Sequence, residues 1–306
     1  MVGRWLSPAA FPRVFRRKQA SALQFMIGRF RFMDKFAKLF ADIGKLWANY
    51  KGAYFTGIEN TLILAVAATL AGCLIGLVCG VLNTIPYTKQ DHVLKRFFLK
   101  LLRAVIRIYV EVFRGTPMVL QAVFIFYGLP YFTDGAIAFK GMAGIWTAAL
   151  LVVSINTGAY MAETVRGGIL SIDPGQTEGA KAIGMNHLQT MLNVIIPQAF
   201  RNIIPQIGNN FIINIKDTSV LSVIGFADLF FMHKSAVGAL YLFFHSASIV
   251  MVIYLVMTVT ASFLLRLLEK KLDGDDNYDL ATTDTLAHTS GMYTYHPKEK
   301  TLEDFK

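Results

Sequence analysis

The sequence predicts an all-α membrane protein, a polytopic bundle with five core transmembrane helices, and three observations lead to this prediction. The chain has 306 residues, of which 54% are hydrophobic and only 16% charged, whereas soluble domains carry about 25% charged residues. The mean hydropathy is +0.47. Five apolar stretches follow one another along the chain, and about 20 consecutive apolar residues suffice to cross a bilayer.

Residues 1–51 precede these stretches and form a basic extension. They carry eleven lysines and arginines against two acidic residues. From Phe25 to Trp47 apolar residues recur at helical spacing, and basic residues fill the other face. We therefore expect a basic amphipathic helix that lies flat on a membrane surface. The alternative is a native start at Met26 or Met33, which N-terminal sequencing of the native protein would reveal.

The five expected spans follow in order within residues 52–271, the predicted transmembrane domain. The second carries Glu111 and Arg114 near its start, and Pro197, Arg201 and Pro205 interrupt the fourth. The spans are expected near residues 61–85, 108–132 and 142–162, from residue 192 onward, and within residues 235–265. Residues 272–306 hold eight acidic residues and three lysines, a composition that predicts a flexible acidic tail.

A polar stretch, residues 171–191, separates the third and fourth spans. Asp173 is suited to cap free backbone N–H groups, and Pro174 suits the first helical position. Gly184 is expected to end this helix, which at about 15 Å is too short to span a membrane. Asn186 then starts a second helix, which is expected to kink at Pro197. The short helix either packs on its own bundle or lies in a groove of another protein.

Lysines and arginines close to the spans predict the orientation, because they are enriched on the cytoplasmic side. If the loop after the first span is cytoplasmic, eleven lie inside and six outside. The polar stretch and the C-terminus then face the cytoplasm. The arginines of the N-terminal extension would lie outside, which conflicts with the rule.

Polar side chains within spans are costly and are candidates for a substrate pathway. Arg114 and Thr116 precede Pro117 in the second span, and Gln121 follows on a similar face. Arg114 would alternatively extend toward the lipid headgroups. The prediction for this span is a cation, a hydroxyl and an amide that contact substrate.

The third and fourth spans add further candidates. Asn156, Tyr160 and Glu163 recur at helical spacing and share one face, either toward substrate or as an interhelical hydrogen-bonded seam. After the fourth span, a polar tetrapeptide either forms a solvated turn or presents backbone groups to an ionised ligand. It consists of Lys216, Asp217, Thr218 and Ser219.

Several classes of function are disfavoured. Cys73 and Cys79 lie six residues apart in the first span, and the six histidines are scattered, so we expect no metal site or disulfide framework. No G-x-x-x-x-G-K-[ST] occurs, so this chain is expected to bind neither ATP nor another cofactor. No catalytic residue is assigned, and His245-Ser246 is expected to be a packed polar pair. The net charge is +10, and the basic residues are expected to bind anionic lipid and not nucleic acid.

The polar stretch resembles the EAA loop of ABC-transporter permeases. The resemblance consists of Glu178-Gly179-Ala180, three residues, Gly184, nine residues, and Val194 to Pro197. Gly179 departs from the alanine of that pattern, and Val194 and Ile196 replace isoleucine and leucine. R-G-T-P at 114–117, K-D-T-S at 216–219 and I-P-Q-A at 196–199 are similar to the histidine, glutamine, arginine and opine group of polar amino acid permeases. The resemblance covers residues 57–271.

The resemblance implies a type I ABC importer permease in a bacterial plasma membrane, with an outside N-terminus. It implies two such subunits, identical or paralogous, two ATPase subunits that hold ATP and magnesium, and a binding protein that delivers a polar amino acid. Closure of the ATPases would push on a coupling helix and drive alternating access. The coupling residues would be Glu178, Gly179, Ala180, Lys181 and Gly184.

Two other classes stay open at this point. A gradient-driven secondary transporter or channel for small polar solutes would lose uptake with ionophores and tolerate ATP depletion. An intramembrane enzyme would need catalytic residues, yet neither H-E-x-x-H nor G-x-S-x-G occurs. A hydrolase activity lost on Ser246→Ala would favour the enzyme.

Overall fold

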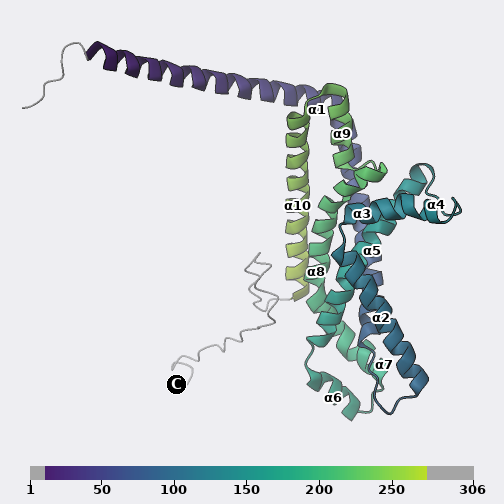
Figure 1. The fold of residues 1–306 in the computed structure, drawn as a ribbon. Helices are drawn as coiled ribbons and strands as arrows, with labels where there is room; N and C mark the ends of the chain where they lie inside the picture. The colour runs from purple at the N-terminus through teal and green to yellow at the C-terminus, as the bar shows by residue number, and fades with distance from the viewer. Residues whose placement is uncertain (1–10, 274–306) are drawn as a thin grey trace, which may run out of the picture.

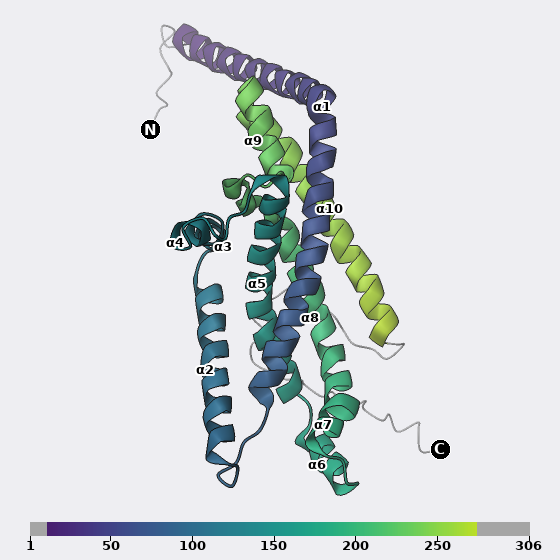
Figure 2. The same cartoon turned by 90° about the vertical axis from the view of Figure 1, so that its right-hand side faces the viewer.

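The computed structural model describes the backbone of residues 11–273 and the side chains from Met33 to Lys271. The acidic tail and residues 1–10 lie outside the described residues. The described part consists of helices, which pack along one another into an elongated bundle (Figures 1 and 2). Within the described residues, three helices are long and apolar enough to cross a membrane, or up to five if each of two bent pairs counts as one span.

Helix α1 (Phe11–Thr84) joins the expected amphipathic extension and the first span in one element of 74 residues. The two were expected as separate segments and are instead continuous. No proline lies between Pro12 and Pro86, so no missing N–H interrupts the helical hydrogen bonds. The N-terminal part of α1 bends away and runs across one end of the bundle (Figures 1 and 2).

The second span, expected over residues 108–132 with a kink at Pro117, is bent far more sharply than a kinked helix. Helix α2 (Val93–Gly115) ends at Thr116, which is extended at φ −120° and ψ 145°. Pro117 disfavours a helical conformation for the residue before it. The chain then turns by 110° into a segment that projects from the bundle (Figure 1). This segment comprises α3 (Met118–Val123), the π turn η1 (Phe124–Gly128) and α4 (Leu129–Phe132).

Three glycines of α1, spaced four residues apart, bring it close to α5 (Gly141–Leu170). A Cβ on Gly72 would lie 2.6 Å from Cβ of Thr157, and a Cβ on Gly80 would lie 2.6 Å from Cβ of Val165. Between them, a Cβ on Gly76 would lie 2.8 Å from the carbonyl carbon of Met161. Small residues at this spacing let helix backbones approach in membranes, so the stripe sets the α1–α5 distance.

A buried amide holds α8 (Ile196–Asp217) to both helices. Asn214 donates hydrogen bonds to the hydroxyls of Thr69 on α1, at 2.8 Å, and Thr157 on α5, at 3.0 Å. All three side chains are buried. Since a buried polar group without a partner is costly, this triad specifies which faces of the three helices meet.

The fourth and fifth spans are arranged differently from the expected ranges. Helix α8 continues into the 3₁₀ turn η3 (Thr218–Ile224), and α9 (Leu229–Leu240) follows at a bend of 49°. Helix α10 (Phe243–Asp273) begins only after Tyr241, whose φ of 57° is left-handed. The apolar run 235–265 therefore belongs to two helices, because its first residues complete α9.

Ser246 of α10 lies in a buried polar cluster. Its Oγ is 2.9 Å from Nδ1 of His233 and 2.9 Å from the hydroxyl of Tyr54. His245, the preceding residue, was expected to pack with Ser246 as a polar pair. Nε2 of His245 lies instead 3.8 Å from Oδ2 of Asp42. All three partners of the cluster are fully or almost fully buried, so the cluster links α1, α9 and α10.

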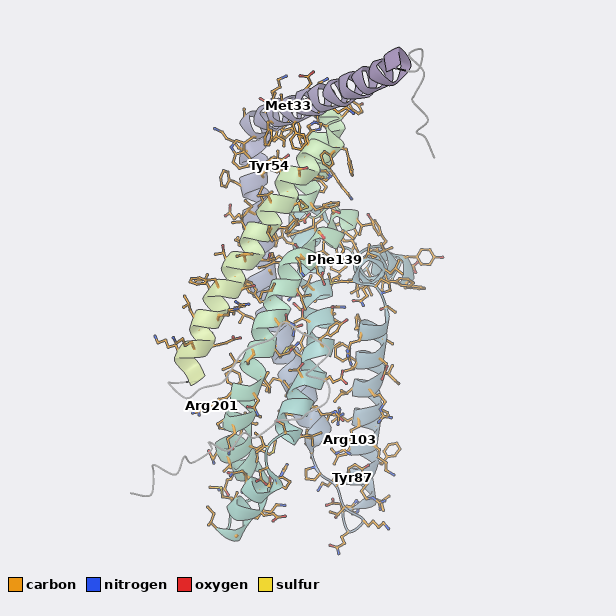
Figure 3. The ribbon with its side chains drawn as sticks, turned by 90° about the vertical axis from the view of Figure 1, so that its left-hand side faces the viewer. Met33, Tyr54, Tyr87, Arg103, Phe139 and Arg201 are labelled. Atoms are coloured by element: carbon orange, nitrogen blue, oxygen red, sulfur yellow. The ribbon has the colours of Figure 1, made fainter. Side chains whose placement is uncertain are left out.

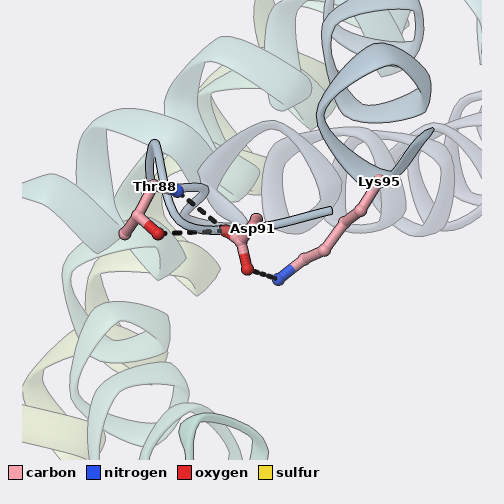
Figure 4. A network of polar contacts seen from close by, with 3 residues as sticks. All are labelled: Thr88, Asp91 and Lys95. Carbon is pink, nitrogen blue, oxygen red and sulfur yellow. Dashed lines mark hydrogen bonds and ion pairs between the residues drawn. The ribbon is translucent and has the colours of Figure 1, made fainter. Parts of the chain in front are cut away.

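The α1–α2 hairpin is closed by one carboxylate. Asp91 accepts hydrogen bonds from the backbone N–H of Thr88 and from Nζ of Lys95, each at 2.8 Å (Figure 4). The bond from Lys95, followed by that from Thr88, lowers the pKa of Asp91 below its usual value. At the same end of the bundle, the Arg103 guanidinium lies 4.6 Å from the centre of the Tyr87 ring (Figure 3).

Candidate functional site

The polar stretch forms a capped helix–turn–helix at the end of the bundle opposite the N-terminal part of α1 (Figure 2). In α6 (Pro174–Ala182), Asp173 accepts a hydrogen bond from the N–H of Gly175 at 2.8 Å. In α7 (His187–Thr190), Asn186 and Gln189 form a reciprocal capping box. These local predictions are confirmed.

Gly184 ends α6 as expected and fixes the shape of the turn. Its φ is +86°, a left-handed conformation that favours glycine. The N–H groups of Gly184 and Met185 bond to the carbonyls of Lys181 and Ala180, which is the Schellman arrangement. The carbonyls at the end of α6 are thus satisfied, and the turn does not depend on a partner.

The expected kink at Pro197 takes the form of a widened turn. The π turn η2 (Met191–Ile195) precedes α8, and Pro197 lies in the first turn of α8. Because helix precedes Pro197 without a break, its missing N–H interrupts the helical hydrogen bonds, and the wider turn of η2 lies just before this point. The segments α7, η2 and α8 continue one another as a single rod, which joins the polar turn directly to the interior of the bundle.

Most of the expected coupling residues face away from this chain. Glu178, Gly179, Lys181 and Gly184 are exposed, whereas Ala180 is buried. Two large apolar side chains beside them, Ile183 and Leu188, are also exposed, at 76% and 66%. A Cβ on Gly179 would meet nothing within 4 Å. Nothing in this chain's own packing therefore requires a small residue at position 179.

The expected pathway residues of α2, α3 and α5 meet in two adjoining groups. In the first, the amide nitrogen of Gln121 donates to Oγ1 of Thr116 at 2.9 Å. The amide nitrogen of Asn156 donates to Oε1 of Gln121, at 3.0 Å, and to the carbonyl of Phe113, at 3.1 Å. These bonds satisfy the carbonyl of Phe113 at the end of α2, so this group is a hydrogen-bonded seam.

The second group lies one turn farther along α5. Arg114 forms an ion pair with Glu163, and its guanidinium lies 5.3 Å from the centre of the Tyr160 ring. The arginine and the glutamate side chains remain 40% and 50% exposed. Helical side chains lean toward the N-terminus of their helix, so side chains of the antiparallel α2 and α5 lean toward each other. The pair carries both charges that a zwitterion could bind.

A cavity of about 320 Å³ adjoins this ion pair between α1, α2 and α5. Glu163 lines it together with Glu111, already noted as a charge in the second span. Three further charged residues of the wall were not among the expected pathway residues: Arg103, Arg107 and Arg166. The α2 members recur at spacings of four residues, and Arg114 follows three residues later. This spacing places them on one face of a helix, and it could have identified them as candidates from the sequence.

The polar tetrapeptide, residues 216–219, spans the end of α8 and the start of η3 and does not join the cavity. Lys216 is exposed, Asp217 is half-buried, and Thr218 is buried with its hydroxyl bonded to the carbonyl of Ile215 at 3.0 Å. Ser219 is half-buried within η3, which packs against α3. The tetrapeptide therefore lies near the seam and not at the cavity wall. Among the residues that the structure describes, no cluster suited to a metal ion occurs.

Comparisons with known proteins identify relatives over most of the chain. A family model described as "Binding-protein-dependent transport system inner membrane component" matches residues 72–274. The glutamine transport system permease protein GlnP of Escherichia coli (strain K12) is 36% identical over 71% of this chain and 91% of that protein. The arginine transport system permease protein ArtQ of Bacillus subtilis (strain 168) is 32% identical over 72% and 92%.

Solved structures have a similar fold. A chain from the crystal structure of an amino acid ABC transporter with histidines superposes with a TM-score of 0.63. That chain is 36% identical, and the match covers 73% of this chain and 96% of that one. A chain of the MetNI methionine ABC transporter in an inward-facing conformation is 19% identical, with a TM-score of 0.54 over 73% and 96%. At that identity the likeness concerns the fold alone.

Proposed function

The chain belongs to the family of binding-protein-dependent transport system inner membrane components, as an ABC permease subunit, and we propose that it forms the translocation pathway for a polar amino acid. The predicted helical permease fold is confirmed. The amino acid would be delivered by an extracytoplasmic binding protein and moved by ATP hydrolysis in a separate subunit. A second permease copy or paralogue would complete the pathway.

The observation that carries the proposal is the exposed, self-capped turn from α6 to α7. It presents Glu178, Gly179 and two apolar side chains at the end of a rod that runs into the bundle. A helix-interior glycine costs about 1 kcal/mol relative to alanine, and this chain's packing does not call for one at position 179. A close approach by an ATPase subunit at this position accounts for the glycine.

Coupling then follows from the geometry. A push on the turn moves α7, η2 and α8 together, and Asn214 of α8 bonds to both α1 and α5. Coupling requires the turn to interact differently with the open and the closed ATPase pair. Residues 171–191 face the cytoplasm in this arrangement, and ATP and magnesium are held by the ATPase and not by this chain.

The pathway is proposed to run along the ion pair and the cavity beside it. Arg114 would bind the α-carboxylate of the amino acid, and Glu163 its ammonium group, so the substrate would replace the pair as it enters. Thr116, Gln121, Asn156 and Tyr160 would line the route next to the pair. Lys216–Ser219 would act at the adjoining end of α8.

The test uses two glycines with open surroundings. The Cβ added by Gly179→Leu meets no atom of this chain within 4 Å, and neither does the Cβ added by Gly44→Leu on α1. Both variants should therefore insert and melt like the parent chain in detergent. In vesicles that contain the full transporter, Gly179→Leu should reduce ATP-dependent uptake at least tenfold and release the ATPase subunit, while Gly44→Leu should leave both unchanged. Parent-level uptake by Gly179→Leu would refute the docking surface.

A second measurement addresses the substrate and the energy source. Uptake of labelled glutamine, arginine and histidine is measured with ATP depletion and with ionophores as separate treatments. Loss of uptake only with ionophores would support the gradient-driven alternative. Glu163→Gln should raise KM severalfold, because it removes the charge proposed to bind the ammonium group, whereas Glu59→Gln, an exposed carboxylate outside the cavity, should not.

A further inference from the structure

The N-terminal arm, defined here as residues 33–50 of α1, is fastened to the end of the bundle. Leu46 is fully buried, and Ile43 and Tyr50 pack against the same core cluster as residues of α9 and α10. Oδ2 of Asp42 lies 3.8 Å from Nε2 of His245 at the start of α10. The arm therefore has a defined orientation relative to the membrane-crossing helices.

A second face of the arm carries large apolar side chains that this chain leaves uncovered. Met33, Phe36, Phe40 and Trp47 are exposed at 60%, 45%, 65% and 40%. At about 100° per residue these four lie within roughly 60° of one another and about 90° from the packed face. We call them the aromatic ridge. Met33 marks its outer end in Figure 3.

Beyond the ridge, α1 carries further exposed apolar side chains. The rings of Trp47 and Phe55 lie 6.0 Å apart, and Phe55 is 59% exposed. Beyond Glu59, the exposed apolar face continues through Ile63, Val66, Leu70 and Leu74. That face belongs to a helix long and apolar enough to span a membrane. The ridge thus lies at the end of an exposed apolar face on a helix that is long enough to span a membrane.

The side of the arm opposite the ridge is basic. Lys35, Lys38 and Lys45 are exposed and lie roughly 120–180° from the centre of the ridge. Asp34 and Asp42 share this side, and Asp42 lies 3.7 Å from Lys45. An apolar ridge with an interfacial tryptophan and lysines on the other side is the arrangement of a helix that lies in a membrane interface.

We propose that the arm lies in the bilayer interface at the end of the bundle opposite α6, with the aromatic ridge among the acyl chains and the lysines on anionic phospholipid headgroups. The occupant of the ridge is lipid and not protein, because the same side of α1 continues, beyond the exposed Lys51 and Glu59, as the apolar face of a helix that can span a membrane. This placement reconciles the basic extension with an outside location, since lipid headgroups neutralise its charge.

The depth of Trp47 tests the placement. Trp5→Phe and Trp146→Phe leave Trp47 as the single tryptophan of the three in the chain. The full chain is reconstituted in phosphatidylcholine vesicles whose lipids carry bromine either close to the headgroup or at the chain end. We expect severalfold stronger quenching by the shallow bromines than by the deep ones. If the double substitution disturbs folding, the same signal comes from the difference between the parent chain and Trp47→Phe.

The lysines are tested by lipid composition. Each lysine near an anionic surface strengthens membrane association on the order of fivefold at low salt. Phosphatidylglycerol should therefore increase shallow quenching, and Lys35→Gln, Lys38→Gln and Lys45→Gln together should remove this increase. The same three lysines changed to arginine form the matched control and should retain it.

Two results would overturn the proposal. One is quenching of Trp47 by aqueous iodide with no response to brominated lipid in any vesicle. The other is protection of Trp47 from iodide only after a second protein is added, which would assign the ridge to a protein partner.

Discussion

Replacement of Gly76 by alanine should separate α1 from α5 and destabilise the protein. The new Cβ would lie 2.8 Å from the carbonyl carbon of Met161 and 2.9 Å from the backbone nitrogen of Ala162, whereas ordinary contacts begin at 3.4 Å. To restore an ordinary contact, the backbone of α5 must retreat by about 3.4 − 2.8 = 0.6 Å. Backbone atoms cannot rotate aside as the end of a side chain can, so the helices move as units.

The cost follows from the contacts beside this position. A gap of about 0.5–1 Å forfeits a quarter to a half of the dispersion energy of each affected contact. Gly72 and Gly80 make equally close approaches on the adjoining turns, so the separation loosens the whole interface. Overpacking of this kind costs about 1–3 kcal/mol. Gly44→Ala meets nothing within 4 Å and should instead gain about 1 kcal/mol of helix propensity.

The assay compares these two variants of one helix by thermal unfolding in the same detergent. Because the gain in helix propensity applies to both alanines and cancels, the difference is the overpacking cost of about 1–3 kcal/mol. It should lower the Tm of Gly76→Ala by about 2–10 °C relative to Gly44→Ala. Binding of a permease partner or an ATPase is not needed for this measurement. Equal Tm values for the two variants would refute the close packing of α1 on α5.

Two further predictions concern polar contacts. Asn214→Ala should cost about 1 kcal/mol, as interhelical hydrogen bonds in membranes do, whereas Asn209→Ala on the exposed side of the same helix should leave the Tm unchanged; equal shifts would exclude a stabilising role for the Asn214 triad. The carboxyl of Asp91 should titrate below the range of a free aspartate, because its pKa is lowered by Lys95 and Thr88. The stabilisation of the hairpin by Asp91 is therefore complete above the usual aspartate pKa and is lost as pH falls through the lowered pKa. NMR of aspartate-labelled protein would record this pKa, and Lys95→Gln should raise it back toward the usual value.

Local features of this protein were predictable from the sequence alone. The ends of α6 and α7 depend on backbone groups within four residues, so Asp173, Gly184 and Asn186 marked them correctly. The apolar stretches predicted the helical bundle in the same way, because hydrocarbon requires every backbone group to bond within its own helix. The bend after α2 was only partly visible, since Pro117 predicted a kink but not a turn of 110°.

Only the tertiary structure decided which faces of the helices meet. The glycine stripe of α1 was present in the sequence, but its partners on α5 are about 85 residues away along the chain. The same is true of Arg114 with Glu163, of Asn214 with Thr69, and of Ser246 with His233. Helical periodicity assigns a side chain to a face and says nothing of the neighbour opposite. That neighbour is set by close packing and by the need to pair buried polar groups, which are properties of the whole bundle.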